Sequence, residues 1–212
     1  MACDLPPGAR ISEAEIAAHY GISRQPVREA FIKLSEEGLI KVRPQRGTVV
    51  ARIDIQSVLD ARFVREATEA DIVRLLAVDP DAALLAELGT QLAAQETVPK
   101  NSPADFIVLD DLFHRTLAEG AGRRTVWSLI ETLKVHFDRV RFITSSRFPT
   151  DTILAQHRHL VERIAAGDPA GAERAIRSHL RAVLDDLPKV TTTHPEFFEG
   201  EIPDDLPRPT AA

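Results

Sequence analysis

The sequence has a single cysteine, Cys3, which excludes an intramolecular disulfide and is typical of a reducing compartment. It has no uninterrupted apolar run of membrane-spanning length, and its N-terminus lacks the charged and apolar regions of a signal peptide. Aromatic residues make up only 5% of the 212 residues, whereas Ala and Leu are abundant, which favours helix packing over sheet. We therefore expect a cytoplasmic, mainly helical protein without a membrane partner.

The charged residues are unevenly distributed along the chain, whose net charge is −6. Residues 1–52 hold eight Lys and Arg against six Asp and Glu, or +2, and the remainder holds eighteen against twenty-six, or −8. A local basic excess is typical of nucleic-acid binding. We expect a DNA-binding domain over residues 1–53 and an acidic domain over 54–187 that does not touch DNA. Residues 188–212 contain five prolines and a cluster of acids, which predicts a disordered tail.

The first domain has the pattern of a helix-turn-helix. An amphipathic helix is expected over residues 12–19, and Gly21 supplies the break after it. Ser23 is a good N-cap for a second helix that runs to about Glu37, and Pro26 lies in its first turn, where a missing N–H costs nothing. Two short helices joined by such a turn form a helix-turn-helix.

A basic hairpin is expected after the second helix, with strands over 39–43 and 48–52. Arg24 and Arg28 share one face of the second helix, so each can pair with guanine O6 and N7 in a DNA major groove. The hairpin suits a wing that lies along phosphate or in the minor groove. A helical subdomain with solvated charges is the alternative, and it explains the ordered set of features poorly. The basic residues around the hairpin tip are Lys41, Arg43 and Arg46.

Residues 6–13 (PPGARISE), 20–31 (YGISRQPVREAF), 34–40 (LSEEGLI) and 46–47 resemble the winged helix-turn-helix of GntR-type bacterial transcription regulators. The resemblance spans about residues 5–53 and implies binding of double-stranded DNA. The positions that match the DNA-contacting residues of that family are Ser23, Arg24, Gln25, Arg28 and Gly47.

One departure concerns the start of the chain. Members of this family usually carry a further helix before the Pro-Pro-Gly, whereas Met1 lies only a few residues ahead of it. We expect this first helix to be missing, either because Met1 is a wrongly placed start or because the DNA-binding domain is truncated and weakened.

The second domain reads as helix throughout, without strand-like alternation or an internal repeat. Long apolar-periodic segments are separated by short breaks, which predicts an all-α bundle of about six helices. The expected helices cover residues 55–77, 82–95, 103–119, 125–145, 150–166 and 169–187.

Four residues of this bundle have the composition of a metal site. Asp110 and His114 lie four residues apart on one helix, so their side chains share a face. His157 and His179 lie on two helices that the turn at Gly167 separates, and antiparallel packing can bring them opposite one another. Three imidazoles and one carboxylate suit Zn²⁺, Ni²⁺, Mn²⁺ or Fe²⁺, with open positions for a further ligand. From the spacing alone, surface or satisfied core histidines remain an alternative.

Residues 110–114 (DDLFH), 156–157 (QH), 163–168 (RIAAGD), Ala172 and His179 resemble the FCD-type ligand-binding domain of the FadR subgroup. The resemblance covers about residues 55–187. It implies a divalent metal to which a small carboxylate effector binds, and the matching ligand positions are Asp110, His114, His157 and His179. His159 lies on a different helix face and is expected to be a bystander. Arg123 stands where this family often has Asn, which changes the pocket rim.

An anionic effector in a bundle needs cationic partners. Arg62, His136 and Arg139 are the candidates for effector binding, whereas Arg141 should point elsewhere unless its helix bends. The segment 136–141 (HFDRVR) resembles that of FCD members that sense sugar acids.

The sequence therefore predicts a metabolite-responsive transcription regulator, not an enzyme, that binds a palindromic operator as a homodimer and represses a catabolic operon. Two alternatives remain. One is a metalloenzyme that uses the Asp/His₃ site, although no general base stands out beside it and an enzyme has no use for a winged helix. The other is a DNA-binding protein whose bundle only dimerises.

Overall fold

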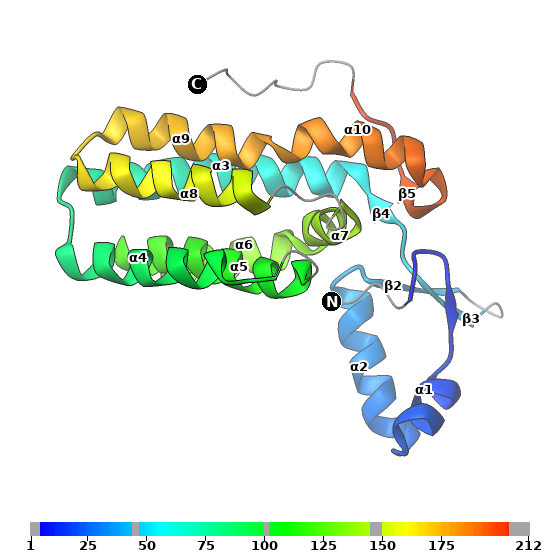
Figure 1. The fold of residues 1–212 in the computed structure, drawn as a ribbon. Coiled ribbons are helices and arrows are strands. Elements are labelled where there is room, and N and C mark those ends of the chain that lie inside the picture. The colour runs from blue at the N-terminus through cyan, green and yellow to red at the C-terminus, as the bar shows by residue number, and fades with distance from the viewer. Residues whose placement is uncertain (1–4, 44–46, 100–101, 145–149, 204–212) are drawn as a thin grey trace.

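A computed structural model describes residues 5–43, 47–99, 102–144 and 150–203. It consists of a small part at the N-terminal end of the chain and a larger bundle of helices (Figure 1). This arrangement confirms the predicted fold class, a winged helix-turn-helix followed by an all-α bundle. Among the described residues, no helix is both long and apolar enough to cross a membrane.

The N-terminal part contains α1 and α2 packed on a three-stranded antiparallel sheet of order β1-β3-β2. The Ser12 hydroxyl caps α1 by accepting from the backbone N–H of Glu15 at 3.1 Å. Gly21 has a φ of +64°, which favours glycine and lets the chain turn sharply into α2. The sequence did not predict β1, which is two residues long. The bounds are β1 Arg10–Ile11, α1 Glu13–Tyr20, α2 Arg24–Glu36, β2 Ile40–Arg43 and β3 Gly47–Val50.

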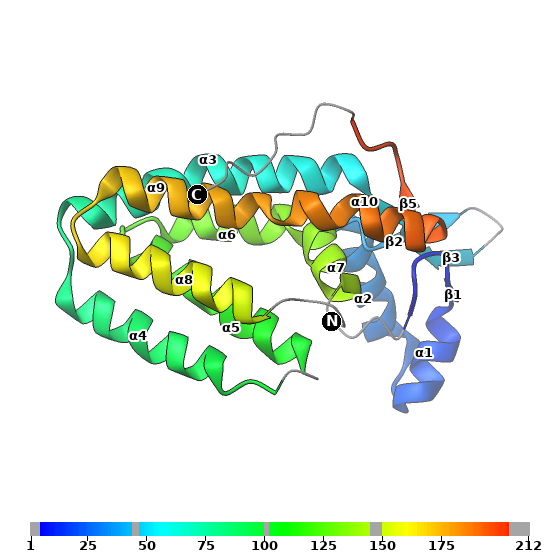
Figure 2. The ribbon, with the colours of Figure 1, turned by 45° about the horizontal axis from the view of Figure 1, so that its top comes forward.

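The bundle is built around α3, which packs along α9, and α8 also packs along α9. Figure 2 shows α10 continuing nearly in line with α9. The main core of the bundle contains buried apolar side chains from several helices, including Val73, Phe113 and Trp127. The helices are α3 Ile55–Val78, α4 Ala82–Glu96, α5 Pro103–Gly120, α6 Arg124–Leu133, α7 Val135–Thr144, α8 Thr150–Ala165, α9 Pro169–Arg181 and α10 Val183–Thr193.

Two helices that the sequence predicted as continuous are divided. The expected helix over 125–145 is α6 and α7, separated at Lys134, whose buried ammonium group pairs with Asp111 at 2.6 Å and with Asp138. The expected helix over 169–187 is α9 and α10, separated at Ala182. Apolar periodicity continues through both positions, and no helix stop signal marks either of them.

The prediction of a disordered tail is wrong for residues 188–203. Helix α10 continues through Pro188 to Thr193, a short 3₁₀ helix spans Pro195–Phe197, and β5 (Phe198–Glu199) follows. The apolar side chains of Val190 and Phe198 are buried, and their burial anchors a stretch that is otherwise rich in proline and acid. Residues 204–212 lie outside the described residues.

A two-stranded parallel sheet joins this last segment to residues 51–54, which form the linker between the two parts. Strand β4 (Ile53–Asp54) pairs with β5, with Ile53 opposite Phe198. Lys41 of the wing forms an ion pair with Glu199 of β5 at 2.6 Å. The linker, the wing and the end of the bundle therefore meet at one joint.

Candidate metal site and nucleic-acid interface

The structure brings the four predicted metal ligands together. Asp110 and His114 of α5, His157 of α8 and His179 of α9 each offer a ligand atom, and these atoms all lie within 4.8 Å of one another. The Nε2 atom of His179 lies 3.2 Å from that of His114 and 3.4 Å from that of His157. His179 is partly buried and the other three are buried.

Each imidazole is held from behind by an oxygen atom. Glu69 Oε2 lies 2.6 Å from His114 Nδ1, and Gln95 Oε1 lies 2.9 Å from His157 Nδ1. The amide of Gln95 donates to the Leu109 carbonyl, which fixes its oxygen toward the imidazole. Oxygens that accept at Nδ1 place the proton there and leave Nε2 with a lone pair. The third such contact joins Gln156 Oε1 to His179 Nδ1 at 2.9 Å.

This arrangement fits a divalent metal ion. Three Nε2 lone pairs that face one another cannot hydrogen-bond among themselves, whereas a shared cation would satisfy them all. Asp110 Oδ1 is buried and has no hydrogen-bond partner, which also favours a cation at this point. Nitrogen and oxygen donors in a three-to-one ratio suit the first-row metals.

The ionisation states of Asp110, His157 and His179 also suit metal binding, which requires neutral imidazoles and an ionised carboxylate. Burial lowers the pKa of His157 to about 3 and places the pKa of His179 well below its ordinary value. Burial would raise the pKa of Asp110, but the charge of the adjacent Arg141 outweighs it and lowers that pKa. At neutral pH the Asp110 carboxylate is therefore ionised, and the imidazoles of His157 and His179 are neutral.

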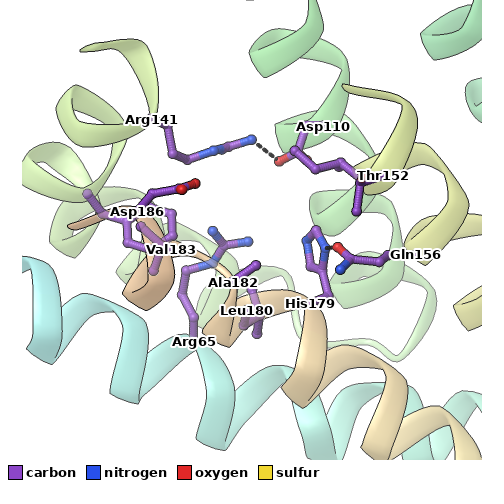
Figure 3. A pocket seen from close by; sticks show the side chains of 12 residues that line it. Arg65, Asp110, Arg141, Thr152, Gln156, His179, Leu180, Ala182, Val183 and Asp186 are labelled. Carbon is purple, nitrogen blue, oxygen red and sulfur yellow. Dashed lines mark hydrogen bonds and ion pairs between the residues drawn. The ribbon is translucent and has the colours of Figure 1, made fainter. Parts of the chain in front are cut away.

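A cavity of about 80 Å³ adjoins these ligands. Figure 3 shows side chains that line it, among them the ligands Asp110 and His179. Two guanidinium groups line it, and each has a carboxylate partner. Arg141 contacts Asp110 at 2.7 Å, and Arg65 contacts Glu69 at 2.7 Å. Since Asp110 and Glu69 also touch the imidazole cluster, the cationic wall of the cavity and the candidate metal site form one connected network.

The residues predicted to bind an effector lie elsewhere. Arg62 is buried and paired with Glu66, and the ring of His136 accepts at Nδ1 from the Asp54 backbone N–H at 3.2 Å. Arg139 donates to the Ala51 carbonyl at 2.6 Å, so it contacts the linker. None of the three is among the residues lining the cavity.

The break at Lys134 explains this difference. Helix α7 begins anew at Val135, and Phe137 and Arg141, four residues apart, share the face that lines the cavity. His136 and Arg139 lie on the opposite side and reach the linker. The prediction that Arg141 points away from the pocket rests on one straight helix over residues 125–145.

Sequence reasoning also missed Arg65 and the residues behind the imidazoles. Glu69 and Gln95 lie on α3 and α4, far from the ligands in sequence, and no local pattern links them to the site. Gln156 precedes His157 directly, and this adjacency was the one usable signal.

The predicted DNA-contacting residues of α2 are exposed. Ser23 occupies the N-cap position without a capping side-chain hydrogen bond, and Gln25 bonds only to Glu29 of its own helix. The side chain of Arg24 is 70% exposed and forms a 3.5 Å ion pair with Glu13, and Arg28 is also exposed. The first turn of α2 therefore presents donors to solvent, as a recognition helix requires.

The wing carries the remaining predicted contacts. Gly47 begins β3, is exposed, and has a φ of +81°. Arg46 lies outside the described residues. On the described strands, Lys41 and Arg43 of β2 are exposed and add positive charge beside the recognition helix.

A winged helix-turn-helix with exposed arginines, joined to an all-helical domain with a ligand cavity, defines a class of DNA-binding transcription regulators. Residues 1–50 match the family "Bacterial regulatory proteins, gntR family", and residues 60–182 match the FCD domain. The chain belongs to the GntR family of bacterial regulatory proteins and carries an FCD domain.

Curated relatives agree with this family. An HTH-type transcriptional regulator of Streptomyces ambofaciens is 38% identical over 199 residues, which cover 93% of this chain and 84% of the relative. The HTH-type transcriptional repressor RspR of Escherichia coli K12 is 34% identical over 201 residues, covering 94% and 88%. The protein is thus a DNA-binding transcription regulator and not an enzyme.

Solved structures show the same fold. The E. coli McbR/YncC structure superposes with a TM-score of 0.70 at 20% identity, covering 88% of this chain and 90% of that chain. A GntR regulator from Rhodococcus sp. RHA1 has a TM-score of 0.68 at 24% identity, covering 87% and 89%. At these identities the likeness concerns the fold alone.

Proposed function

We propose that this regulator is a homodimeric repressor that senses a small carboxylate through a divalent metal held by Asp110, His114, His157 and His179. One observation carries the proposal: three bare Nε2 atoms and an unpartnered carboxylate oxygen converge beside a cavity whose wall holds two buried arginines.

The chain's own residues supply most of the effector site. Arg141 and Arg65 are buried cations, so they hold their donors toward the cavity at little further cost in side-chain entropy. His179 links the two regions because it belongs to the ligand set and also lines the cavity. When bound, the ion would supply a positive charge that a carboxylate oxygen can join directly.

Helix α7 offers a route from the cavity to DNA. Its residues Phe137 and Arg141 line the cavity, while His136 and Arg139 contact the linker at Asp54 and Ala51. A ligand that draws Arg141 toward itself would shift this helix and with it the linker. An effector regulates only as far as it binds one arrangement better than the other, which is typically about 1–3 kcal/mol of coupling.

Self-association is supported by exposed apolar side chains on α5 and α6, two helices that pack together. On each helix two of them lie four residues apart and therefore share a face. A two-fold dimer would bury such a face and would place two recognition helices on a palindromic operator. The side chains are Val108, Leu112, Leu129 and Leu133, which are 42–67% exposed.

The repressor assignment rests on the relative RspR, whose name describes a repressor. For this chain it means that operator binding blocks transcription and that the effector weakens operator binding.

The test is an operator-binding titration with full-length protein and a DNA site selected from a random pool. Wild-type protein should contain about one metal ion per chain, sediment as a dimer and lose operator affinity when a cognate carboxylate from a panel is added. His114→Ala should lose metal and effector response together while keeping operator binding. An unchanged response in His114→Ala would overturn the proposed sensor site.

A further inference from the structure

One acidic side chain in the cavity has no part in the network described so far. Asp186 lies in the first turn of α10 and lines the cavity, and Figure 3 shows it across from His179 and Gln156. Its ion-pair partner is Lys189, at 3.0 Å on the outer surface, whose own side chain is 69% exposed. An ion pair with so exposed a lysine is weak, so it leaves most of the Asp186 charge uncompensated.

The arginines that line the cavity already have acidic partners. Arg141 contacts Asp110 at 2.7 Å and, less closely, Asp111 and Asp138, which also pair with Lys134. Arg65 contacts Glu69 at 2.7 Å. A divalent ion on the imidazoles would add two positive charges, and Asp186 would oppose one of them. The positive charge of the ion would suit one carboxylate on the ligand, and Asp186 is a cavity-lining carboxylate whose ion-pair partner is an exposed lysine. A second carboxylate near Asp186, whose side chain is 35% exposed, would meet a like charge that water screens only in part.

The cavity also limits the size of the ligand. At roughly 10–15 Å³ for each water-sized position, a volume of about 80 Å³ holds roughly five to eight such positions. This corresponds to an acid of three or four carbons. When such an acid has its carboxylate at the imidazole end, its other end lies near Asp186. A carboxylate there can only accept hydrogen bonds, so it selects a donor.

We propose that Asp186 is a specificity-determining residue that selects short monocarboxylic acids bearing a hydrogen-bond donor and rejects dicarboxylates. This inference rests on the proposed function, because it assumes that the cavity holds the effector. The donor is a hydroxyl or an ammonium group, which Asp186 recognises by the same accepting oxygen. The functional consequence is discrimination between acids of equal size that differ only in their second group.

The test measures binding by calorimetry to metal-loaded, full-length wild type, Asp186→Asn and Asp185→Asn. Glycerate and malonate form one pair with equal numbers of non-hydrogen atoms, and threonate and malate form another; serine supplies the ammonium donor. Asp185 is the matched control, because it is the exposed neighbour of Asp186 on the same helix and does not line the cavity.

In wild type and Asp185→Asn we expect the monocarboxylate of at least one pair to bind at least about tenfold more tightly than its dicarboxylate partner, the scale of one charged hydrogen bond. In Asp186→Asn the affinity for the monocarboxylate should decrease and the affinity for the dicarboxylate should increase. The ratio of the two affinities should therefore fall by about tenfold or more. If wild type binds serine more tightly than glycerate and Asp186→Asn loses this preference, the donor is an ammonium group. If wild type prefers glycerate and the variant loses that preference, the donor is a hydroxyl.

Two failures are distinguishable. If stoichiometrically metal-loaded wild type binds none of these acids, the proposed carboxylate sensor is wrong, and the role of Asp186 is overturned with it. If acids bind but Asp186→Asn leaves the ratio between the paired acids unchanged, the role of Asp186 is wrong and the sensor stands.

Discussion

The recognition helix and the cavity both rely on arginine, yet they use it in opposite ways. The side chain of Arg24 is 70% exposed and has one 3.5 Å contact with Glu13, whereas that of Arg141 is 6% exposed and lies 2.7 Å from Asp110. An exposed arginine is available to a partner from outside the molecule, and we propose that the partner of Arg24 is DNA. A buried one must be matched inside the fold before any ligand arrives.

This difference determines how mutations should act. If α2 reads DNA as we propose, loss of a charge on it should remove a contact to DNA and leave the fold intact. Loss of a charge around the cavity leaves a partner buried without compensation, so it affects stability as well as binding.

The largest effect is expected at the buried pair beside His114. Glu69→Gln should lower the free energy of unfolding by about 3–5 kcal/mol, because it leaves Arg65 buried without an ion-pair partner. Glu119→Gln, which weakens an exposed pair with Arg115, should cost about 0–1 kcal/mol. Urea unfolding of both variants measures the difference, and equal losses would contradict the contrast between buried and exposed pairs.

The second largest effect on stability is expected when the metal is removed. Protein treated with chelator should be less stable than protein at a metal concentration of 100 times Kd by about 2.7 kcal/mol, since the ion binds only the folded state. His179→Ala should lose the ion, while His159→Ala, whose side chain is 55% exposed on α8, should keep it. Metal analysis after gel filtration decides, and stoichiometric metal in His179→Ala would refute the ligand set.

Substitutions on the recognition helix should lower the affinity for DNA and leave the other properties unchanged. Arg24→Ala and Arg28→Ala should each weaken specific operator binding by about 1–3 kcal/mol if they pair with guanine. Both variants should keep wild-type metal content and thermal stability. Lys33→Ala, in the last turn of the same helix, is the control. Full operator affinity in the double variant of Arg24 and Arg28 would remove α2 from the interface.

The smallest effect concerns pH at the joint. Burial, together with the charge of Arg139, lowers the pKa of His136 below its ordinary 6.5 despite the nearby Asp54 and Glu199 carboxylates and with Lys41 also close. The unfolded chain therefore binds a proton at His136 more tightly than the folded protein does. The free energy of unfolding keeps its full value above about pH 6.5. It decreases as the pH falls below about 6.5, by at most about 1.4 kcal/mol per pH unit. Comparison of unfolding free energies for wild type and His136→Asn tests this, and identical slopes would exclude His136 as the cause.

Local spacing predicted the features whose determinants are local. The recognition helix follows from Gly21, Ser23 and the apolar repeat, and Asp110 with His114 follows from a four-residue interval on one helix. The convergence of His157 and His179 came from the resemblance to a family, since spacing alone left it open. The structure brings these ligands together, but whether they bind a metal stays a prediction.

Features set by packing between distant segments were missed. Glu69 and Gln95 approach the imidazoles from other helices, and Arg141 reaches the cavity only because α7 starts afresh after Lys134. The segment up to Pro203 packs on the bundle through the buried side chains of Val190 and Phe198, and Phe197 and Ile202 are partly buried beside them. Its composition suggests disorder, because composition averages over the few apolar side chains that anchor it.

The pairing of Ile53 with Phe198 has a consequence for the order of folding. Contacts within the winged helix-turn-helix are close in sequence and can form while the chain is still being synthesised. The joint requires β5, which leaves the ribosome after all of the helices. The DNA-binding part of a nascent chain can therefore fold before β5 is available to pair with β4. Translation that stops short of residue 198 would leave the linker held by the contacts of His136 and Arg139 on α7 and without its strand partner.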